Sequence, residues 1–201
     1  MNHYFIGLML AASANAESGI AVLDRNNEII TIDKLFSMQD IQHFFDNFPS
    51  LKNSQICISL PWDNSMLNGK WRILSKPYQL VSSNEKFQNT DNWTQRFSNR
   101  GSDYFNTLTE QNVQINRFEL YLTRQALKLE SSFKERSPAD CKALQNALRM
   151  KHGFNLSSNM MPMAHLEALV GAVLAKKIDD EKNLKQEKPL FEFNGLPVIR
   201  G

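Results

Sequence analysis

The sequence predicts one α/β domain, and three observations support this fold class. Short apolar runs of strand length recur along the chain, such as residues 4 to 12 and Gln55 to Leu60. Helix signals with capping residues stand between and after these runs. The composition, with 42% hydrophobic and 22% charged residues in 201 residues, is that of a globular protein large enough to bury a core.

The first forty residues predict a three-stranded meander. After the apolar run at residues 4 to 12, strand-like alternation continues at Ile20 and Val22 and again from Glu28 to Ile32. Between the last two strands, Arg25-Asn26-Asn27 predicts a hairpin turn, because Asn tolerates positive φ.

A helix and a fourth strand are expected next. Ser37 is the expected N-cap, with Asp40 three residues later as a variant of the capping box, and Pro49 ends the helix. Gln55 to Leu60 is wholly apolar, which is typical of a strand buried on both faces of a mixed or parallel sheet. Residues 61 to 112 form a long insertion to which we assign no elements.

The second half predicts one strand followed by helices. Val113 to Tyr121 is the strand, and Thr123 is the expected cap of a short helix that runs to Leu129. Ser137-Pro138-Ala139-Asp140 predicts a second helix start, with a cap, a proline at the first helical position and an acid in the first turn, and Gly153 predicts its end.

A third helix is expected from about Met163 to Lys177, where small residues would let it approach a neighbouring element closely. We therefore expect the domain to span residues 1 to 178. Residues 179 to 201 are predicted to be a charged linker and an apolar tail that docks back on the domain.

The N-terminus has a second interpretation. Phe5 to Ala12 is apolar, and Ala14-Asn15-Ala16 is similar to a signal-peptidase site, so residues 1 to 16 are also read as a signal peptide. The segment contains no Lys or Arg, and its removal would delete the first predicted strand. We therefore expect a strand here and not a signal peptide. We also expect a cytoplasmic protein, because Cys57 and Cys141 have no spacing typical of a metal site or a disulfide framework.

Four short segments carry the functional argument. They are Ile6-Gly7-Leu8-Met9-Leu10-Ala11, Ile56-Cys57-Ile58-Ser59-Leu60-Pro61, Phe118-Glu119-Leu120-Tyr121-Leu122-Thr123 and His165-Leu166-Glu167-Ala168-Leu169-Val170. In this order they resemble a bacterial family of predicted RNase H-like nucleases of the RuvC-type superfamily. The resemblance implies an RNase H-like fold with a central mixed sheet of five strands, an antiparallel meander plus parallel strands, flanked by helices.

The resemblance also implies four acidic positions, of which two are lost here. Met9 and Ser59 stand where the family has aspartates, Glu119 is kept, and Glu167 replaces the last aspartate. Nucleases of this fold use two divalent ions, which need several converging carboxylates. A thioether and a neutral hydroxyl do not supply this charge. The resemblance therefore implies a degenerate nuclease, or pseudoenzyme, that binds or scaffolds and has no cofactor.

Two alternatives remain open at this stage. Asp63 is a possible substitute ligand, so that Glu119, Glu167 and Asp63, with Asp24, form a rearranged site of a Mg²⁺- or Mn²⁺-dependent nuclease or phosphodiesterase. The other alternative is a purely structural subunit. Without a metal, Glu119 needs a basic partner, for which Arg117, Arg72 and Arg124 are the candidates, and Glu119 and Glu167 are expected to repel each other.

The charge distribution bears on partners. The net charge is only +2, but residues 117 to 151 hold eight bases against four acids: Arg117, Arg124, Lys128, Lys134, Arg136, Lys142, Arg149 and Lys151, against Glu119, Glu130, Glu135 and Asp140. This region is the expected contact for a nucleic-acid or protein partner, although a solvated helix face explains the pattern more simply. A homodimer stays open, and no apolar segment is long enough to predict a membrane span.

Overall fold

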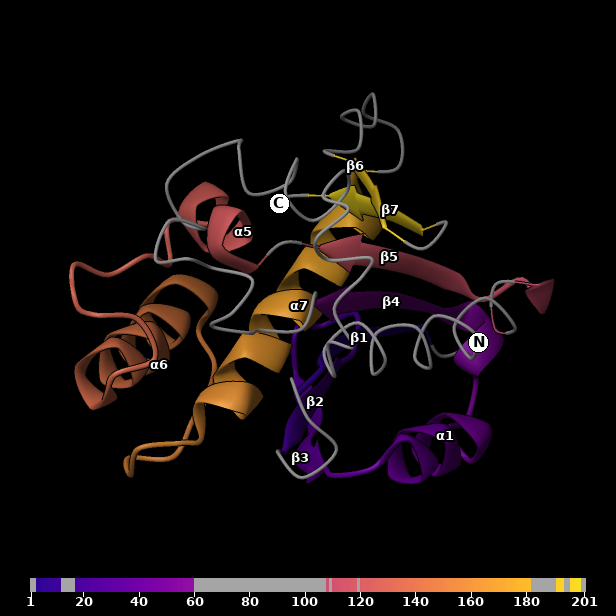
Figure 1. The fold of residues 1–201 in the computed structure, drawn as a ribbon, viewed down its shortest axis with the longest axis horizontal. Helices are drawn as coiled ribbons and strands as arrows, with labels where there is room; N and C mark the ends of the chain where they lie inside the picture. Colours follow the sequence, from indigo (N-terminus) through magenta and orange to yellow (C-terminus); the bar gives the residue numbers. More distant parts are fainter. Residues whose placement is uncertain are drawn as a thin grey trace, which may run out of the picture.

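The computed structural model describes residues 3–11, 17–59, 108, 110–118, 120–181, 191–193 and 196–199, and it is an α/β fold around one mixed sheet (Figure 1). The strands are β1 (Tyr4–Met9), β2 (Ser18–Leu23), β3 (Ile29–Leu35), β4 (Ser54–Ser59), β5 (Gln114–Phe118), β6 (Phe191–Phe193) and β7 (Leu196–Ile199). The helices are α1 (Met38–Asp46), α5 (Leu120–Ala126), α6 (Pro138–His152) and α7 (Met163–Asp180), with a 3₁₀ turn η1 (Leu51–Asn53) before β4.

The sheet has the order β3-β2-β1-β4-β5-β7-β6. Strands β1, β2 and β3 form the expected antiparallel meander, and β4 and β5 follow in parallel with β1. The C-terminal tail adds β7 in parallel beside β5 and then β6 in antiparallel, so the five expected strands are extended to seven. Because β1 and β4 run in parallel, both of these central strands end at the same edge of the sheet.

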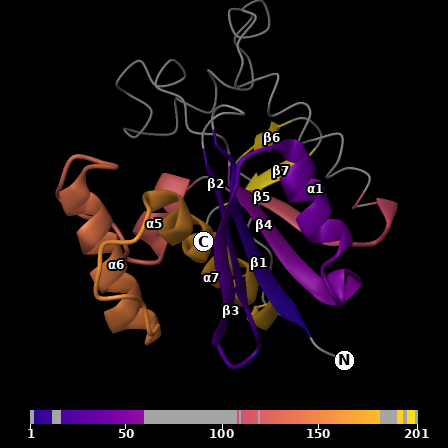
Figure 2. The same cartoon turned by 90° about the horizontal axis from the view of Figure 1, so that it is seen from below.

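Helices cover both faces of the sheet (Figure 2). Alternate residues of β1 divide between two cores, because side chains alternate across a strand. Phe5 and Met9 belong to the core under α7, and Ile6 and Leu8 belong to the core under α1. Helix α7 packs across β1, β2 and β4, and α5 and α6 pack against α7.

Close contact between α7 and the sheet depends on glycine. A Cβ atom on Gly7 would lie 1.9 Å from the Ala168 carbonyl oxygen, and one on Gly19 would lie 2.0 Å from the Ala164 carbonyl oxygen. Such separations are far below van der Waals contact, so only glycine fits at these two positions. The N-terminal half of α7 is thereby held directly on β1 and β2.

Local signals in the sequence are confirmed at several element ends. Ser37 and Asp40 form the capping box of α1, and Ser137 caps α6 with Pro138 in the first turn. Gly153 ends α6 in the left-handed conformation at φ 70°. In the β2–β3 turn, Asn27 has φ 67°, as the hairpin prediction requires.

The prediction for Thr123 is wrong. Strand β5 ends at Phe118, α5 already begins at Leu120, and Thr123 lies buried inside this helix, where its carbonyl accepts a hydrogen bond from Leu127 N–H. Leu120 packs against the core under α7, which accounts for the earlier start. The helix ends before Lys128, whose positive φ of 56° stops it short of Leu129.

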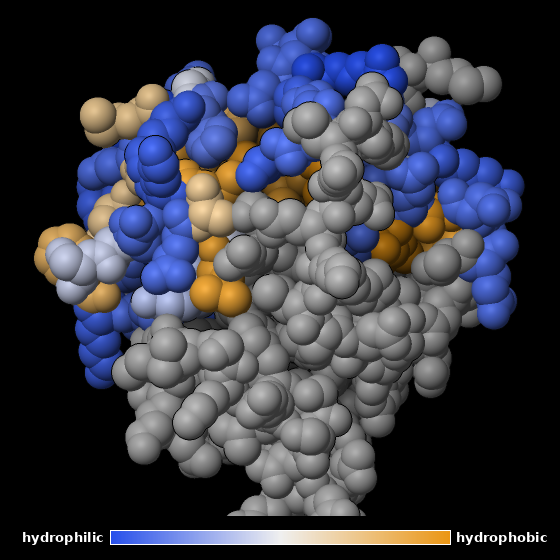
Figure 3. All heavy atoms as spheres, turned by 90° about the horizontal axis from the view of Figure 1, so that it is seen from above, coloured by the Kyte–Doolittle hydropathy of each residue, from blue (hydrophilic) through white to orange (hydrophobic). Residues whose placement is uncertain are grey.

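Most of the predicted insertion at 61 to 112 lies outside the described residues. On the face shown in Figure 3, polar residues cover much of the described surface and apolar side chains show between them. Among the residues that the structure does describe, no helix is long and apolar enough to cross a membrane.

Candidate functional site

Met9 and Ser59 lie side by side at the carboxyl ends of the two central strands. Strands β1 and β4 pair in parallel with Leu8 opposite Ile58, so the next residue of each strand ends at the same edge. The Ser59 hydroxyl donates a hydrogen bond to Met9 Sδ at 2.7 Å and accepts one from Leu10 N–H at 3.3 Å. Both side chains are buried.

This pair is a poor ligand set for a hard divalent cation. Mg²⁺ and Mn²⁺ prefer charged oxygen ligands, whereas the Met9 thioether is soft and carries no charge. The Ser59 hydroxyl is neutral and already takes part in two hydrogen bonds. The two residues therefore satisfy each other, and neither adds the negative charge that a metal centre requires.

Glu167 lies on α7 above the same end of the sheet. Met9 is paired with Gly19, which lies under Ala164, and Gly7 lies under Ala168. Glu167 is thus on the turn of α7 that covers the end of β1, and its side chain is 1% exposed.

The Glu167 carboxylate has a basic partner. Arg136 Nη1 lies 3.3 Å from Glu167 Oε2, and the geometry is that of an ion pair without a directed hydrogen bond to this oxygen. Burial raises the pKa of Glu167 to about 7, and the charges of Arg136 and Arg124 oppose this rise only in part. Glu167 is thus attracted to an arginine that we did not predict as its partner, whereas the predicted repulsion between Glu167 and Glu119 concerns a residue outside the described part of the chain.

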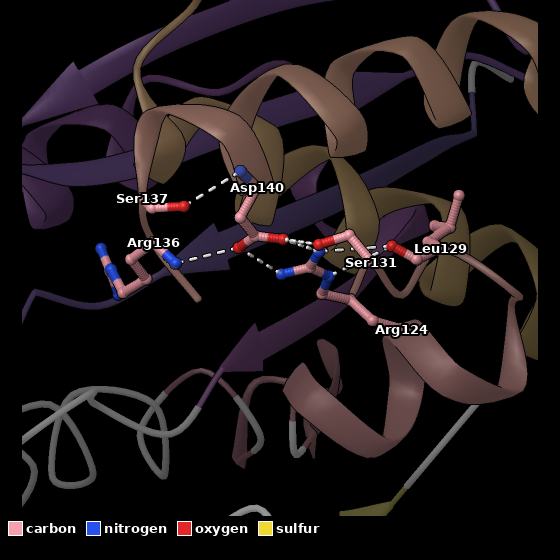
Figure 4. A network of polar contacts seen from close by, with 6 residues as sticks. All are labelled: Arg124, Leu129, Ser131, Arg136, Ser137 and Asp140. Carbon is pink, nitrogen blue, oxygen red and sulfur yellow. Dashed lines mark hydrogen bonds and ion pairs between the residues drawn. The ribbon is translucent and has the colours of Figure 1, made fainter. Parts of the chain in front are cut away.

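A second ion pair is buried between α5 and α6 (Figure 4). Arg124 on α5 donates two hydrogen bonds to Asp140 in the first turn of α6, at 3.2 and 2.7 Å. Asp140 also accepts hydrogen bonds from the Ser131 hydroxyl and from the backbone N–H of Arg136. Burial alone would raise the pKa of Asp140, but these hydrogen bonds and the charge of Arg124 hold it below its ordinary value.

The structure does not bring together all the sequence-predicted residues. It places Met9, Ser59 and Glu167 at one end of the sheet, whereas Glu119 and Asp63 lie outside the described residues. Asp24 is excluded from any rearranged site at this end. It follows β2, which runs antiparallel to β1, and its carboxylate accepts the N–H groups of Asn26 and Glu28 in the hairpin turn at the opposite end.

Internal contacts engage much of the basic stretch between residues 117 and 151. Arg117 is buried in β5, where burial lowers its pKa to about 10, and Arg124 is buried and paired with Asp140. Other cations of the stretch contact the protein itself: Arg136 at Glu167, Lys142 at the Ser158 carbonyl, Arg149 at the Leu156 and Ser157 carbonyls, and Lys151 at the Lys128 carbonyl.

Sequence reasoning missed Arg136 and the Arg124–Asp140 pair. Asp140 carried a signal for the α6 N-terminus, but nothing in the local pattern indicated that Arg124 would contact it. Within the described parts of the chain, no three His, Cys, Asp or Glu side chains gather closely enough to hold a metal ion. Comparisons with protein-family models, with curated proteins and with solved structures gave no significant match.

Proposed function

We propose that this protein is an RNase H-like domain that has lost its metal centre and acts as a binding or scaffolding module. The strand order supports the fold assignment. An antiparallel meander, β3-β2-β1, followed by the parallel strands β4 and β5 is the arrangement that the family resemblance implies.

One observation carries the proposal: the 2.7 Å hydrogen bond from the Ser59 hydroxyl to Met9 Sδ. These are the two positions where the resemblance implies aspartates. Their adjacency at the ends of β1 and β4 supports the correspondence, and their chemistry opposes metal binding.

The loss of two carboxylates is decisive for the chemistry. Two-metal cleavage of a phosphodiester needs anionic ligands that hold both ions near the attacking and leaving oxygens. Glu167, the third acidic position, is held by Arg136, so its charge is already balanced within the protein. A domain with this arrangement keeps the fold of a nuclease and a packed core in place of its metal site.

We favour a protein partner over nucleic acid. Phosphate binding depends on basic side chains that face solvent and release counterions. In the basic region, Arg117 and Arg124 are buried and Arg136 is paired with Glu167, so the exposed lysines are fewer than the eight cations that the sequence counts; they are Lys128, Lys134, Lys142 and Lys151. The net charge of +2 adds little long-range attraction for a polyanion.

Thermal unfolding with and without Mn²⁺ or Mg²⁺ tests the proposal. A bound ion whose free concentration is 100 times its dissociation constant would stabilise the folded state by about 2.7 kcal/mol. This would raise the Tm of a protein of this size by roughly 5 °C or more. We expect that millimolar Mn²⁺ or Mg²⁺ leaves the Tm unchanged. A Mn²⁺-dependent rise that disappears in Glu119→Gln would instead support the rearranged, active metal site.

A further inference from the structure

Arg136 is held where its side chain reaches a buried carboxylate from the protein surface. It directly precedes Ser137, the N-cap of α6, and has a left-handed backbone with φ 55°. Its N–H donates to Asp140 Oδ2 at 2.9 Å, which fixes the backbone. Its side chain is 31% exposed, whereas that of Glu167 is 1% exposed.

The charged and titratable groups around Glu167 come from three elements besides α7. Helix α5 contributes Arg124, α6 contributes Asp140 and the Cys141 thiol, and the preceding loop contributes Arg136. Arg124 and Asp140 are joined by two hydrogen bonds and balance each other. From the sheet below, Met9 and Ser59 add no charge. Among the described residues, the positive charge closest to Glu167 is thus that of Arg136, at 3.3 Å.

We infer that Arg136 is the resident cation of this site: its guanidinium neutralises Glu167 and competes with any divalent ion for that carboxylate. The ion pair stands on its own geometry, whereas the competition with a metal rests on the proposed function. Arg136 is then a second determinant of the lost metal centre, in addition to Met9 and Ser59. Restoring the two aspartates alone would leave this competitor in place.

The first test asks whether a guanidinium ion is required beside Glu167. At pH 8, Arg136→Ala should lower the Tm by about 5 °C or more, because it leaves a buried carboxylate without its closest counter-charge. Millimolar guanidinium chloride, far below the denaturing range, should restore part of this loss. Arg136→Ala/Glu167→Gln should show no such recovery, and Lys134→Ala, which removes an exposed cation of the same loop, should leave the Tm nearly unchanged.

The second test measures Mn²⁺ affinity in Met9→Asp/Ser59→Asp with and without Arg136→Ala. We expect the triple variant to bind Mn²⁺ at least tenfold more tightly, and the matched Lys134→Ala triple variant to bind like the double variant. Equal affinity with and without Arg136 would overturn the competition while leaving the proposed function intact. If no variant binds Mn²⁺, Met9 and Ser59 do not correspond to the metal-ligating aspartates of the family. The proposed competition between Arg136 and a divalent ion for Glu167 then fails as well. In the first test, if guanidinium chloride does not raise the Tm of Arg136→Ala, the role of Arg136 as the counter-ion of Glu167 is overturned.

Discussion

Replacing Glu167 with Gln isolates the cost of burying its carboxylate. The side chain is 1% exposed, and burial raises its pKa from 4.5 to about 7 despite the nearby arginines. The folded protein therefore binds this proton more tightly than the unfolded chain does. Wild-type stability should fall as the pH rises from about 4.5 to about 7 and then level off, as far as this group is concerned.

The magnitude follows from the difference in proton affinity. A tenfold difference in proton affinity corresponds to about 1.4 kcal/mol. The rise of the Glu167 pKa from 4.5 to about 7 therefore corresponds to about 3 kcal/mol of unfolding free energy. Gln cannot titrate, so Glu167→Gln should lack this fall. Relative to the wild type, the variant should gain stability between pH 5 and pH 7 and be neutral or mildly stabilising near pH 7.

Urea unfolding at pH 5, 6, 7 and 8 measures this difference directly, provided that the slope with denaturant stays constant. Glu181→Gln is the matched control, because Glu181 is an acid at the exposed end of the same helix and its side chain is 46% exposed. The control should track the wild type at every pH. A stability difference between Glu167→Gln and wild type that does not change with pH would refute the reasoning.

Two further predictions concern packing and charge around the same site. Asp140→Asn should cost about 3 kcal/mol or more at neutral pH, because it leaves Arg124 buried without its charged partner, whereas Asp180→Asn on the exposed end of α7 should cost less than about 1 kcal/mol by urea unfolding. Because the pKa of Asp140 is held below 3.8, its contribution should persist above about pH 4 and disappear at lower pH. Gly7→Ala should cost about 3 kcal/mol or more in the same assay, because its Cβ would lie 1.9 Å from the Ala168 carbonyl oxygen. Gly153→Ala, where no atom lies within 4 Å, should cost only about 1 kcal/mol for its positive φ, and equal losses for the two glycines would contradict the packing of α7.

The parts of the fold that follow from local chemistry could be predicted from the sequence. The capping box at Ser37 and Asp40, the turn at Asn27 and the glycine stop at Gly153 each depend on residues a few positions apart. The resemblance implied that Met9 and Ser59 are neighbours, and the parallel register of β1 and β4 brings these two strand ends together.

The charged contacts could not be predicted in the same way. Arg136 reaches Glu167 only because the loop before α6 brings it over α7, and a local pattern does not encode this path. Arg124 is paired with Asp140, sixteen residues along the chain, and the sequence pattern did not indicate this contact. Thr123 has the chemistry of an N-cap, but the packing of Leu120 starts α5 earlier and buries Thr123 inside the helix.

The most direct test of the lost metal centre is the Mn²⁺ response of Met9→Asp/Ser59→Asp. If both residues occupy former ligand positions, their carboxylates should lie close together near Glu167, repel each other and lower the Tm of the metal-free variant. Mn²⁺ should then recover stability in the variant, by linkage, while the wild type is unmoved. A double variant that folds but melts at the same temperature with and without Mn²⁺, both with Arg136 and with Arg136→Ala, would contradict the assignment of these positions and the RNase H-like proposal with it.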